Sequence, residues 1–379
     1  MNDDSQYEVA VVGGGPAGLT AALYTTRLGH DTVLIDRGGG RAAMMQDTHN
    51  VIGVTEETSG MEFLQTGREQ VASYGGDTVR GFVSEIEQTG GDAESDSEST
   101  SDGEGTASGD DSPRFTLTAG GDSYGADYVV LATGFSDERP DPPLPRTGQG
   151  LHYCLHCDAY MFVDEPVYVM GTGEAAAHVA MIMLNFTDEV DVLTRGEEIE
   201  WSEETDYQLR NHPVEVIDTE IEGMSKDDNG WLESFEFADG TTREYRGGFP
   251  MYGSDHNADL ADQLGVERND DGTIAVDDHG WTSVDGVLAV GDIVPGHNQI
   301  PVAMGQGAKA GIGIHYEARE FPRSTAEIEE HGPVTQADVP AVSQDLLETA
   351  VTHEGHAAGP RVESGADGET EETEAPADD

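Results

Sequence analysis

The two cysteines of this chain, Cys154 and Cys157, stand three residues apart and are followed directly by Asp158. A Cys-x-x-Cys spacing brings two sulfurs within bonding reach, and in proteins one thiol of such a pair is often the reactive thiolate. The pair therefore predicts a dithiol that is oxidised reversibly to a disulfide. The carboxyl group of Asp158 is placed to move protons during that exchange.

A metal site is the alternative interpretation, because His152 and His156 flank the two cysteines. Structural zinc sites usually draw their ligands from two separated pairs, and the chain has no second cysteine pair. We therefore expect redox chemistry and no bound metal. Two cysteines in 379 residues also exclude a disulfide-stapled scaffold and favour a reducing compartment.

A glycine motif, Gly13-x-Gly15-x-x-Gly18, follows an apolar strand expected at residues 7–12 and opens a helical pattern. In such a turn the first glycine permits the bend, the second admits a pyrophosphate, and the third allows helix and strand to pack closely. The helix N-terminus favours the negative phosphates. Asp36 ends the next strand, where it can bind a ribose diol.

A second motif, Gly171-x-Gly173-x-x-Ala176, has the same setting between a strand expected at 166–170 and a helix expected at 174–184. Alanine is small enough for the third position. Two dinucleotide folds in one chain suggest two dinucleotides that exchange electrons. An inherited fold that no longer binds a nucleotide tightly is the alternative.

The elements that position these motifs alternate between strands and helices. The pattern predicts further strands at 79–87, 114–118, 128–132, 189–194, 214–222, 231–237 and 286–292, and helices at 303–319 and 342–351. We expect an α/β fold with two Rossmann-like units. Residues 88–113 and the end of the chain are acidic and poor in apolar side chains, which predicts disorder.

The charge of the chain excludes several functions. It carries 76 Asp+Glu against 18 Lys+Arg, a formal net charge of -58, and would repel nucleic acid and anionic membranes. Only Lys226 and Lys309 are lysines, and this acid-rich, lysine-poor composition resembles that of salt-in halophilic archaea. We find no signal peptide and no membrane-length apolar run, so we expect a cytoplasmic protein.

The order of the motifs resembles the low-molecular-weight thioredoxin reductase family of FAD-dependent pyridine nucleotide-disulfide oxidoreductases. The shared order is the first glycine motif, a strand ending in Thr133-Gly134, Cys-x-x-Cys-Asp, the second glycine motif, and Gly291-Asp292 before a helix of small residues. The resemblance covers residues 7–320 without the acidic insertion. It implies a homodimer whose smaller domain rotates during turnover.

The resemblance also implies a domain division. Residues 1–146 and 249–325 would form the FAD domain, with 88–113 as a disordered insertion. Residues 147–248 would form an inserted pyridine-nucleotide domain that carries Cys-x-x-Cys. Residues 326–379 would be an extension with an acidic tail.

Site residues follow from the same resemblance. The FAD contacts would be Gly13, Gly15, Ala17, Gly18, Asp36, Gly40, Arg41, Asn50, Gly291, Asp292, Gln299 and Ile300. Cys157 would face the flavin, Cys154 would exchange with an external disulfide, and Asp158 would be the acid/base.

The nicotinamide contacts would be Gly171, Gly173, Ala176 and Arg195. Here the chain departs from the family, which has His-Arg-Arg after this strand, because glutamates follow Arg195 at 197, 198 and 200. A 2′-phosphate needs cations, so the sequence leaves the donor open among NADPH, NADH and another reductant such as ferredoxin.

We therefore expect a thioredoxin reductase-like flavoprotein that passes electrons through flavin and the Cys pair to a thioredoxin-like protein or a small disulfide. Two alternatives stay open. One is a flavin-dependent dithiol oxidase that uses oxygen. The other is a flavin- or metal-binding redox sensor without turnover.

Overall fold

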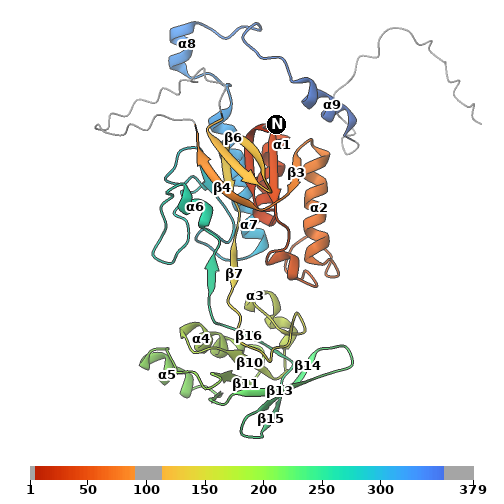
Figure 1. Cartoon of the computed structure of the whole chain (residues 1–379), viewed down its shortest axis with the longest axis vertical. Coiled ribbons are helices and arrows are strands. Elements are labelled where there is room, and N and C mark those ends of the chain that lie inside the picture. Colours follow the sequence, from red (N-terminus) through yellow and green to blue (C-terminus); the bar gives the residue numbers. More distant parts are fainter. Residues whose placement is uncertain (1–4, 90–112, 354–379) are drawn as a thin grey trace, which may run out of the picture.

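The structure, a computed structural model, describes residues 5–89 and 113–353. Figure 1 shows two α/β units, one above the other, joined by extended chain. Most of the acidic insertion and of the acidic tail lies outside the described residues, so the prediction of disorder there concerns residues that the structure does not describe.

A mixed sheet in the order β3-β2-β1-β6-β5-β4 forms the core of the first unit, and β18 pairs with β6. Strands β3, β2, β1, β6 and β18 run parallel, whereas β5 and β4 add an antiparallel edge. The strands are β1 Ser5–Val12, β2 Thr32–Asp36, β3 Asp77–Arg80, β4 Val83–Gln88, β5 Phe115–Ala119, β6 Asp122–Leu131 and β18 Val287–Ala289.

Three helices pack on one face of this sheet: α1 (Pro16–Arg27), α2 (Gly60–Ser73) and α7 (Ile300–Ala318). Helices α1 and α7 approach closely because α7 carries glycines at the contact. A Cβ on Gly307 would lie 2.2 Å from the Ala17 carbonyl oxygen, and one on Gly311 would lie 3.1 Å from that of Ala21. The small-residue helix thus joins the last third of the chain to the first.

The second unit has a parallel sheet in the order β12-β11-β10-β16-β9-β8 and a separate antiparallel sheet, β13-β14-β15. Its strands are β8 Arg146–Thr147, β9 Gly150–Leu151, β10 Val167–Met170, β11 Val190–Leu193, β12 Val214–Ile217, β13 Ile221–Lys226, β14 Leu232–Phe237, β15 Thr242–Glu244 and β16 Gly247–Pro250. Its helices are α3 Leu155–Asp158, η2 Ala159–Phe162, α4 Glu174–Met183 and α5 Glu203–Arg210.

Two antiparallel strands, β7 (Phe135–Asp137) and β17 (Ser254–His256), connect the units. The first unit also contains η1 (Ala42–Met44) and α6 (Asp259–Gln263). Beyond α7 the chain forms α8 (Thr325–His331) and α9 (Gln344–Thr352), and it returns to the first unit where His353 stacks on Tyr74 at 4.2 Å.

The α/β class and both predicted β-α-β units are confirmed, with bounds shifted by up to three residues. Two predicted single strands are wrong: 79–87 is β3 and β4, and 214–222 is β12 and β13, and in each case a short irregular segment separates the two strands. Helices α2 and α5 escape prediction from the sequence, because their apolar residues are too few for a strong periodic pattern. Within the described residues, no helix combines the length and the apolar character needed to cross a bilayer.

Candidate active site

Cys154 and Cys157 are joined in a disulfide at the start of α3, with their Cα atoms 5.2 Å apart. Cys154 is the N-cap residue of this short helix. The Cys157 N–H donates to Cys154 Sγ at 3.1 Å and the Cys154 carbonyl accepts the N–H of Asp158 at 3.1 Å. The sulfur of Cys154 therefore already has a donor that would stabilise a thiolate.

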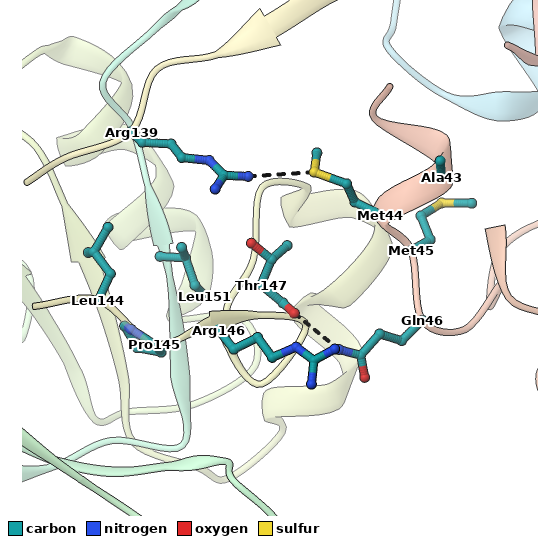
Figure 2. A pocket seen from close by; sticks show the side chains of 10 residues that line it. All are labelled: Ala43, Met44, Met45, Gln46, Arg139, Leu144, Pro145, Arg146, Thr147 and Leu151. Atoms are coloured by element: carbon teal, nitrogen blue, oxygen red, sulfur yellow. Dashed lines mark hydrogen bonds between the residues drawn. The ribbon is translucent and has the colours of Figure 1, made fainter. Parts of the chain in front are cut away.

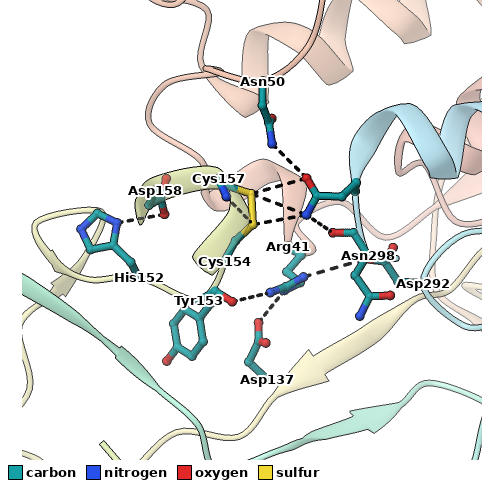
Figure 3. The surroundings of a disulfide bond; sticks show 11 residues. Arg41, Asn50, Asp137, His152, Tyr153, Cys154, Cys157, Asp158, Asp292 and Asn298 are labelled. Carbon is teal, nitrogen blue, oxygen red and sulfur yellow. Dashed lines mark hydrogen bonds and ion pairs between the residues drawn. A yellow bond between two sulfur atoms is a disulfide. The ribbon is translucent and has the colours of Figure 1, made fainter. Parts of the chain in front are cut away.

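The disulfide faces the first unit (Figure 3). Gln299 Nε2 lies 3.5 Å from Cys154 Sγ and 3.9 Å from Cys157 Sγ, and Asn50 Nδ2 donates to Gln299 Oε1 at 2.9 Å. Gln299 precedes α7 as its N-cap residue, and Asn50 follows η1. Three distant parts of the chain thus meet at the sulfurs.

Arg41 ties the two units together beside this point. Its Nε donates to Asp137 Oδ2 at 2.8 Å, and its Nη2 donates to the Tyr153 carbonyl, next to Cys154, at 2.9 Å. Its Nη1 lies 4.0 Å from Asp292 Oδ2. Burial raises the pKa of Asp292 above its ordinary value, and the Arg41 charge opposes that rise.

Asp158 contacts a histidine. Its Oδ2 lies 3.0 Å from Nδ1 of His152, whose side chain is 4% exposed. His152 Nε2 is buried and has no hydrogen-bond partner among the described residues. Neither the cysteines nor any other described His, Asp or Glu side chains form a group of three able to hold a metal ion.

The first glycine motif has the geometry of a pyrophosphate cradle. Gly13 has φ +108°, and a Cβ there would lie 2.4 Å from the Ala132 carbonyl oxygen. A Cβ on Gly18 would lie 1.9 Å from the Gly13 carbonyl oxygen, whereas one on Gly15 would meet nothing within 4 Å. Gly15 is the N-cap of α1 and offers no side-chain cap, so the helix N-terminus opens onto free space.

The other expected FAD residues surround this cradle or the disulfide. Asp36 ends β2, and its carboxyl group would lie 2.6 Å from a Cβ on Gly14. Gly291 follows β18 with φ +81°, and a Cβ there would lie 2.9 Å from the Ala17 side chain. Gly40 follows β2 at φ +86°, and Ile300 is the first residue of α7. This donor set fits FAD: a cradle for the pyrophosphate, a carboxylate for the ribose, and polar side chains at the disulfide.

The second glycine motif keeps its backbone geometry. Gly171 has φ +143°, and a Cβ there would lie 2.7 Å from the Met251 carbonyl oxygen and 3.3 Å from the Ala176 side chain. A Cβ on Gly173 would meet nothing within 4 Å. Glu174 is the first residue of α4, and hydrogen bonds from Thr205 and from the Ser202 N–H hold its pKa below the usual value.

The cation expected here, Arg195, is 7% exposed and adopts φ +57°. Its Nε has no hydrogen-bond partner among the described residues, and its charge acts on half-buried Tyr252. Burial raises the pKa of Tyr252. The following glutamates at 197, 198 and 200 are exposed, and the Glu200 N–H donates to the Thr172 carbonyl of the glycine turn at 2.9 Å. An acidic segment therefore lies against this turn.

A cavity of about 550 Å³ lies between the units (Figure 2), where residues 43–46 face residues 144–147. Arg139 Nη2 lies 3.6 Å from Met44 Sδ, and Gln46 Nε2 donates to the Thr147 carbonyl at 3.1 Å. These contacts add to those of Arg41 in holding the units together.

Three contacts of the site were not expected from the sequence: His152 with Asp158, Arg41 with Asp137, and Asn50 with Gln299. Each joins residues that no local pattern pairs. The sequence hints at the first contact, because His152 is close to the Cys pair, but that closeness indicates a metal site equally well.

Comparisons with known proteins identify the family and similar folds. The family model "Pyridine nucleotide-disulphide oxidoreductase" matches residues 7–307. Thioredoxin reductases of Peptoclostridium litorale and Aquifex aeolicus are each 29% identical to the chain, over 82% of its length and 96% and 93% of theirs. Thioredoxin reductase of Bacillus subtilis is 26% identical, over 85% of the chain and 98% of its own length.

Two solved structures are similar to the chain. The crystal structure of HlmI has a TM-score of 0.71 at 29% identity and covers 84% of this chain and 93% of its own. The structure of thioredoxin reductase from Streptococcus pyogenes has a TM-score of 0.71 at 26% identity, and the match covers 84% of this chain and 100% of that one.

Proposed function

The chain belongs to the pyridine nucleotide-disulphide oxidoreductase family, and from this premise we propose that it reduces the disulfide of a thioredoxin-like protein or of a small molecule through Cys154 and Cys157. It is an FAD-dependent disulfide oxidoreductase, as its thioredoxin reductase relatives indicate. The observation that carries the proposal is the disulfide 3.5 Å from Gln299, at the edge of the unit that contains the pyrophosphate cradle.

FAD, when bound, supplies a two-electron carrier. The proposed contacts are those the motifs suggest. The N–H groups at the start of α1 would bind the pyrophosphate, Asp36 the ribose, and Arg41, Asn50, Asp292 and Gln299 the part of the cofactor nearest the disulfide. The close contact between Ala17 and Gly291 supports a single pocket built from both ends of the chain.

Cys154 is the proposed attacking thiolate, supported by the N–H of Cys157 that points at its sulfur. A bond forms between Cys154 Sγ and one substrate sulfur, the substrate disulfide breaks, and the leaving thiolate takes a proton from Asp158. Cys157 then attacks Cys154, which re-forms the internal disulfide and releases the second thiol. Two electrons pass from the dithiol to the substrate.

We propose a pyridine nucleotide as the donor, bound at the turn of Gly171 and Gly173, with little preference for NADPH over NADH. The family supports the nucleotide. The buried position of Arg195 and the exposed glutamates after it argue against strong recognition of a 2′-phosphate. Anaerobic stopped-flow reduction of the flavin by each nucleotide in molar KCl measures this preference.

The same acidic segment supports a second candidate, a dithiol oxidase that passes electrons from a dithiol to oxygen. Oxygen uptake with dithiothreitol and without nucleotide would favour this candidate. Rapid flavin reduction by NADPH or NADH, followed by disulfide reduction, would favour the reductase.

We further propose the setting in which the enzyme acts. The net charge of -58 supports a salt-rich cytoplasm. From the family resemblance of the sequence we propose a homodimer of chains, each divided into an FAD domain (1–146 and 249–325) and an inserted domain (147–248). Light scattering in molar KCl should give twice the mass of one chain. The mass of a single chain would contradict the homodimer.

Disulfide reduction by wild-type enzyme and by Cys154→Ser and Cys157→Ser variants tests the function itself. Both variants should bind FAD normally and lose turnover. Retained reduction of a disulfide in either variant would contradict the proposal.

A further inference from the structure

In the described part of the chain, the Asp158 carboxylate has one side-chain hydrogen-bond partner, the imidazole of His152. Nδ1 of His152 lies 3.0 Å from Asp158 Oδ2. Figure 3 shows the carboxylate between this ring and the disulfide. Asp158 follows Cys157 directly, so a group that fixes this carboxylate also fixes it relative to the sulfurs.

The His152 ring is held on all sides. Phe162 packs edge-on at 5.1 Å between centroids, Trp231 lies nearly parallel at 6.0 Å, and Phe249 lies at 6.4 Å. The backbone N–H of His152 donates to the carbonyl of Gly248 in strand β16 at 2.9 Å. The side chain is 4% exposed, so it cannot turn to another partner without breaking this packing.

The unpartnered Nε2 indicates which tautomer is present. A proton on Nε2 would leave a buried N–H without an acceptor among the described residues, which is unfavourable. A proton on Nδ1 instead donates to Asp158 Oδ2. The neutral Nδ1–H tautomer therefore suits the site, and it occupies Oδ2 whether or not the carboxyl group is protonated.

We propose that His152 is a positioning residue for disulfide reduction: its Nδ1–H holds Oδ2 of Asp158 and leaves Oδ1 to exchange the proton with the leaving thiolate. The inference rests on the proposed function, in which Asp158 is the acid. The proton balance is unchanged, because the proton given to the thiolate returns to Asp158 from the dithiol. His152 itself gives up no proton.

The test uses two small disulfides with leaving groups of different basicity. Bis(2-hydroxyethyl) disulfide releases an alkyl thiolate that needs a proton, whereas 5,5′-dithiobis(2-nitrobenzoate) releases a weakly basic thiolate that leaves without one. FAD-loaded enzyme is reduced with dithionite, freed of excess reductant and mixed anaerobically with each disulfide. A residue that positions the acid affects only the first substrate.

Three variants separate the possibilities. We expect Asp158→Asn to lose about 100-fold with bis(2-hydroxyethyl) disulfide, within the usual range for general acids. His152→Phe keeps an aromatic ring but has no donor, and its rate with the same disulfide should fall about 10-fold. In His152→Asn the amide N–H can take the place of Nδ1–H, so its rate should lie within about 3-fold of the wild-type rate. All three should react normally with 5,5′-dithiobis(2-nitrobenzoate).

A double variant completes the test. His152→Phe combined with Asp158→Asn should be no slower than Asp158→Asn alone, since the two residues act through one proton. Phe162→Leu is the matched control: it loosens the same aromatic packing without removing the donor, and should leave the substrate preference unchanged.

Each failure has its own pattern. Equal slowing of His152→Phe on both disulfides, or a loss that adds to that of Asp158→Asn, would show a structural role and overturn the inference. Full activity in His152→Phe together with a slow Asp158→Asn would overturn the inference about His152 and leave the proposed role of Asp158 intact. Full activity in Asp158→Asn would remove the proposed acid and the inference with it.

Discussion

Gln299 Nε2 lies 3.5 Å from Cys154 Sγ, although 145 residues separate them along the chain. The amide comes from the start of α7 in the first unit, and the sulfur from the start of α3 in the second. The contact therefore marks the arrangement in which the disulfide is docked against the FAD-binding unit.

Replacement of Gln299 by leucine should slow disulfide reduction about 10-fold while FAD content stays the same. The reason is that small misplacements of reacting groups cost large factors in rate. Steady-state turnover normalised to bound flavin is the measurement. Asn298→Leu, an exposed neighbour, is the control and should change turnover by less than 2-fold. Equal effects of the two variants would contradict a specific role for Gln299.

The two cysteines should differ in a trapping experiment. In Cys157→Ser the Cys154 thiolate attacks a substrate disulfide and no second thiol resolves it, so a stable mixed disulfide accumulates. In Cys154→Ser we expect little adduct. Mass spectrometry of the reduced variants after exposure to bis(2-hydroxyethyl) disulfide measures the amount of mixed disulfide in each. More adduct on Cys157 than on Cys154 would reverse the assigned roles.

Asp292→Asn should stabilise the FAD-free protein at pH 7. Burial raises the pKa of Asp292, so the folded state retains a proton that the unfolded chain releases. The stability from this group is complete below the ordinary pKa of about 3.9 and is lost as pH rises through the raised value. The asparagine variant avoids that loss.

Chemical unfolding at pH 4.5 and pH 7 in molar KCl measures this difference for Asp292. The gain of the variant should be larger at pH 7 than at pH 4.5. Exposed Asp278→Asn is the control and should show no such dependence. A variant that is less stable than wild type at pH 7 would contradict the prediction.

Glu198→Arg should lower the KM for NADPH about 10-fold and leave that for NADH nearly unchanged. A guanidinium beside the glycine turn can pair with a 2′-phosphate, which NADH lacks. Glu204→Arg makes the same charge change on the exposed side of α5 and serves as control. A similar gain for both nucleotides, or in both variants, would mean that only the overall charge matters.

Concentrated salt should stabilise the whole protein. At 1 M salt the Debye length is about 3 Å, so repulsion among the carboxylates of a chain with net charge -58 fades. The unfolding temperature should rise steadily from 0.2 to 2 M KCl. Sucrose of equal osmolality, which does not screen charge, should give a smaller rise. Equal rises would contradict the electrostatic explanation.

Local patterns are enough to predict the two β-α-β units, because glycine turns and alternating strands and helices depend on neighbouring residues. The same patterns predict the chemistry of Cys154 and Cys157. They cannot predict that Arg41 reaches the Tyr153 carbonyl, or that Gln299 meets the sulfurs, since both contacts depend on how the units dock. His152 stands out in the sequence for its type, yet its partner emerges only from the fold.

The interrupted chain order of the first unit has a consequence for biosynthesis. The second unit is one continuous stretch, from β8 to β16, whereas β18 and α7 complete the first unit from the far end of the chain. Nascent domains fold as units while the ribosome still elongates the chain, so the second unit can fold early. The first unit can be completed only after Ala318 has left the exit tunnel, because β6 lacks its partner β18 and α1 lacks its partner α7 until then.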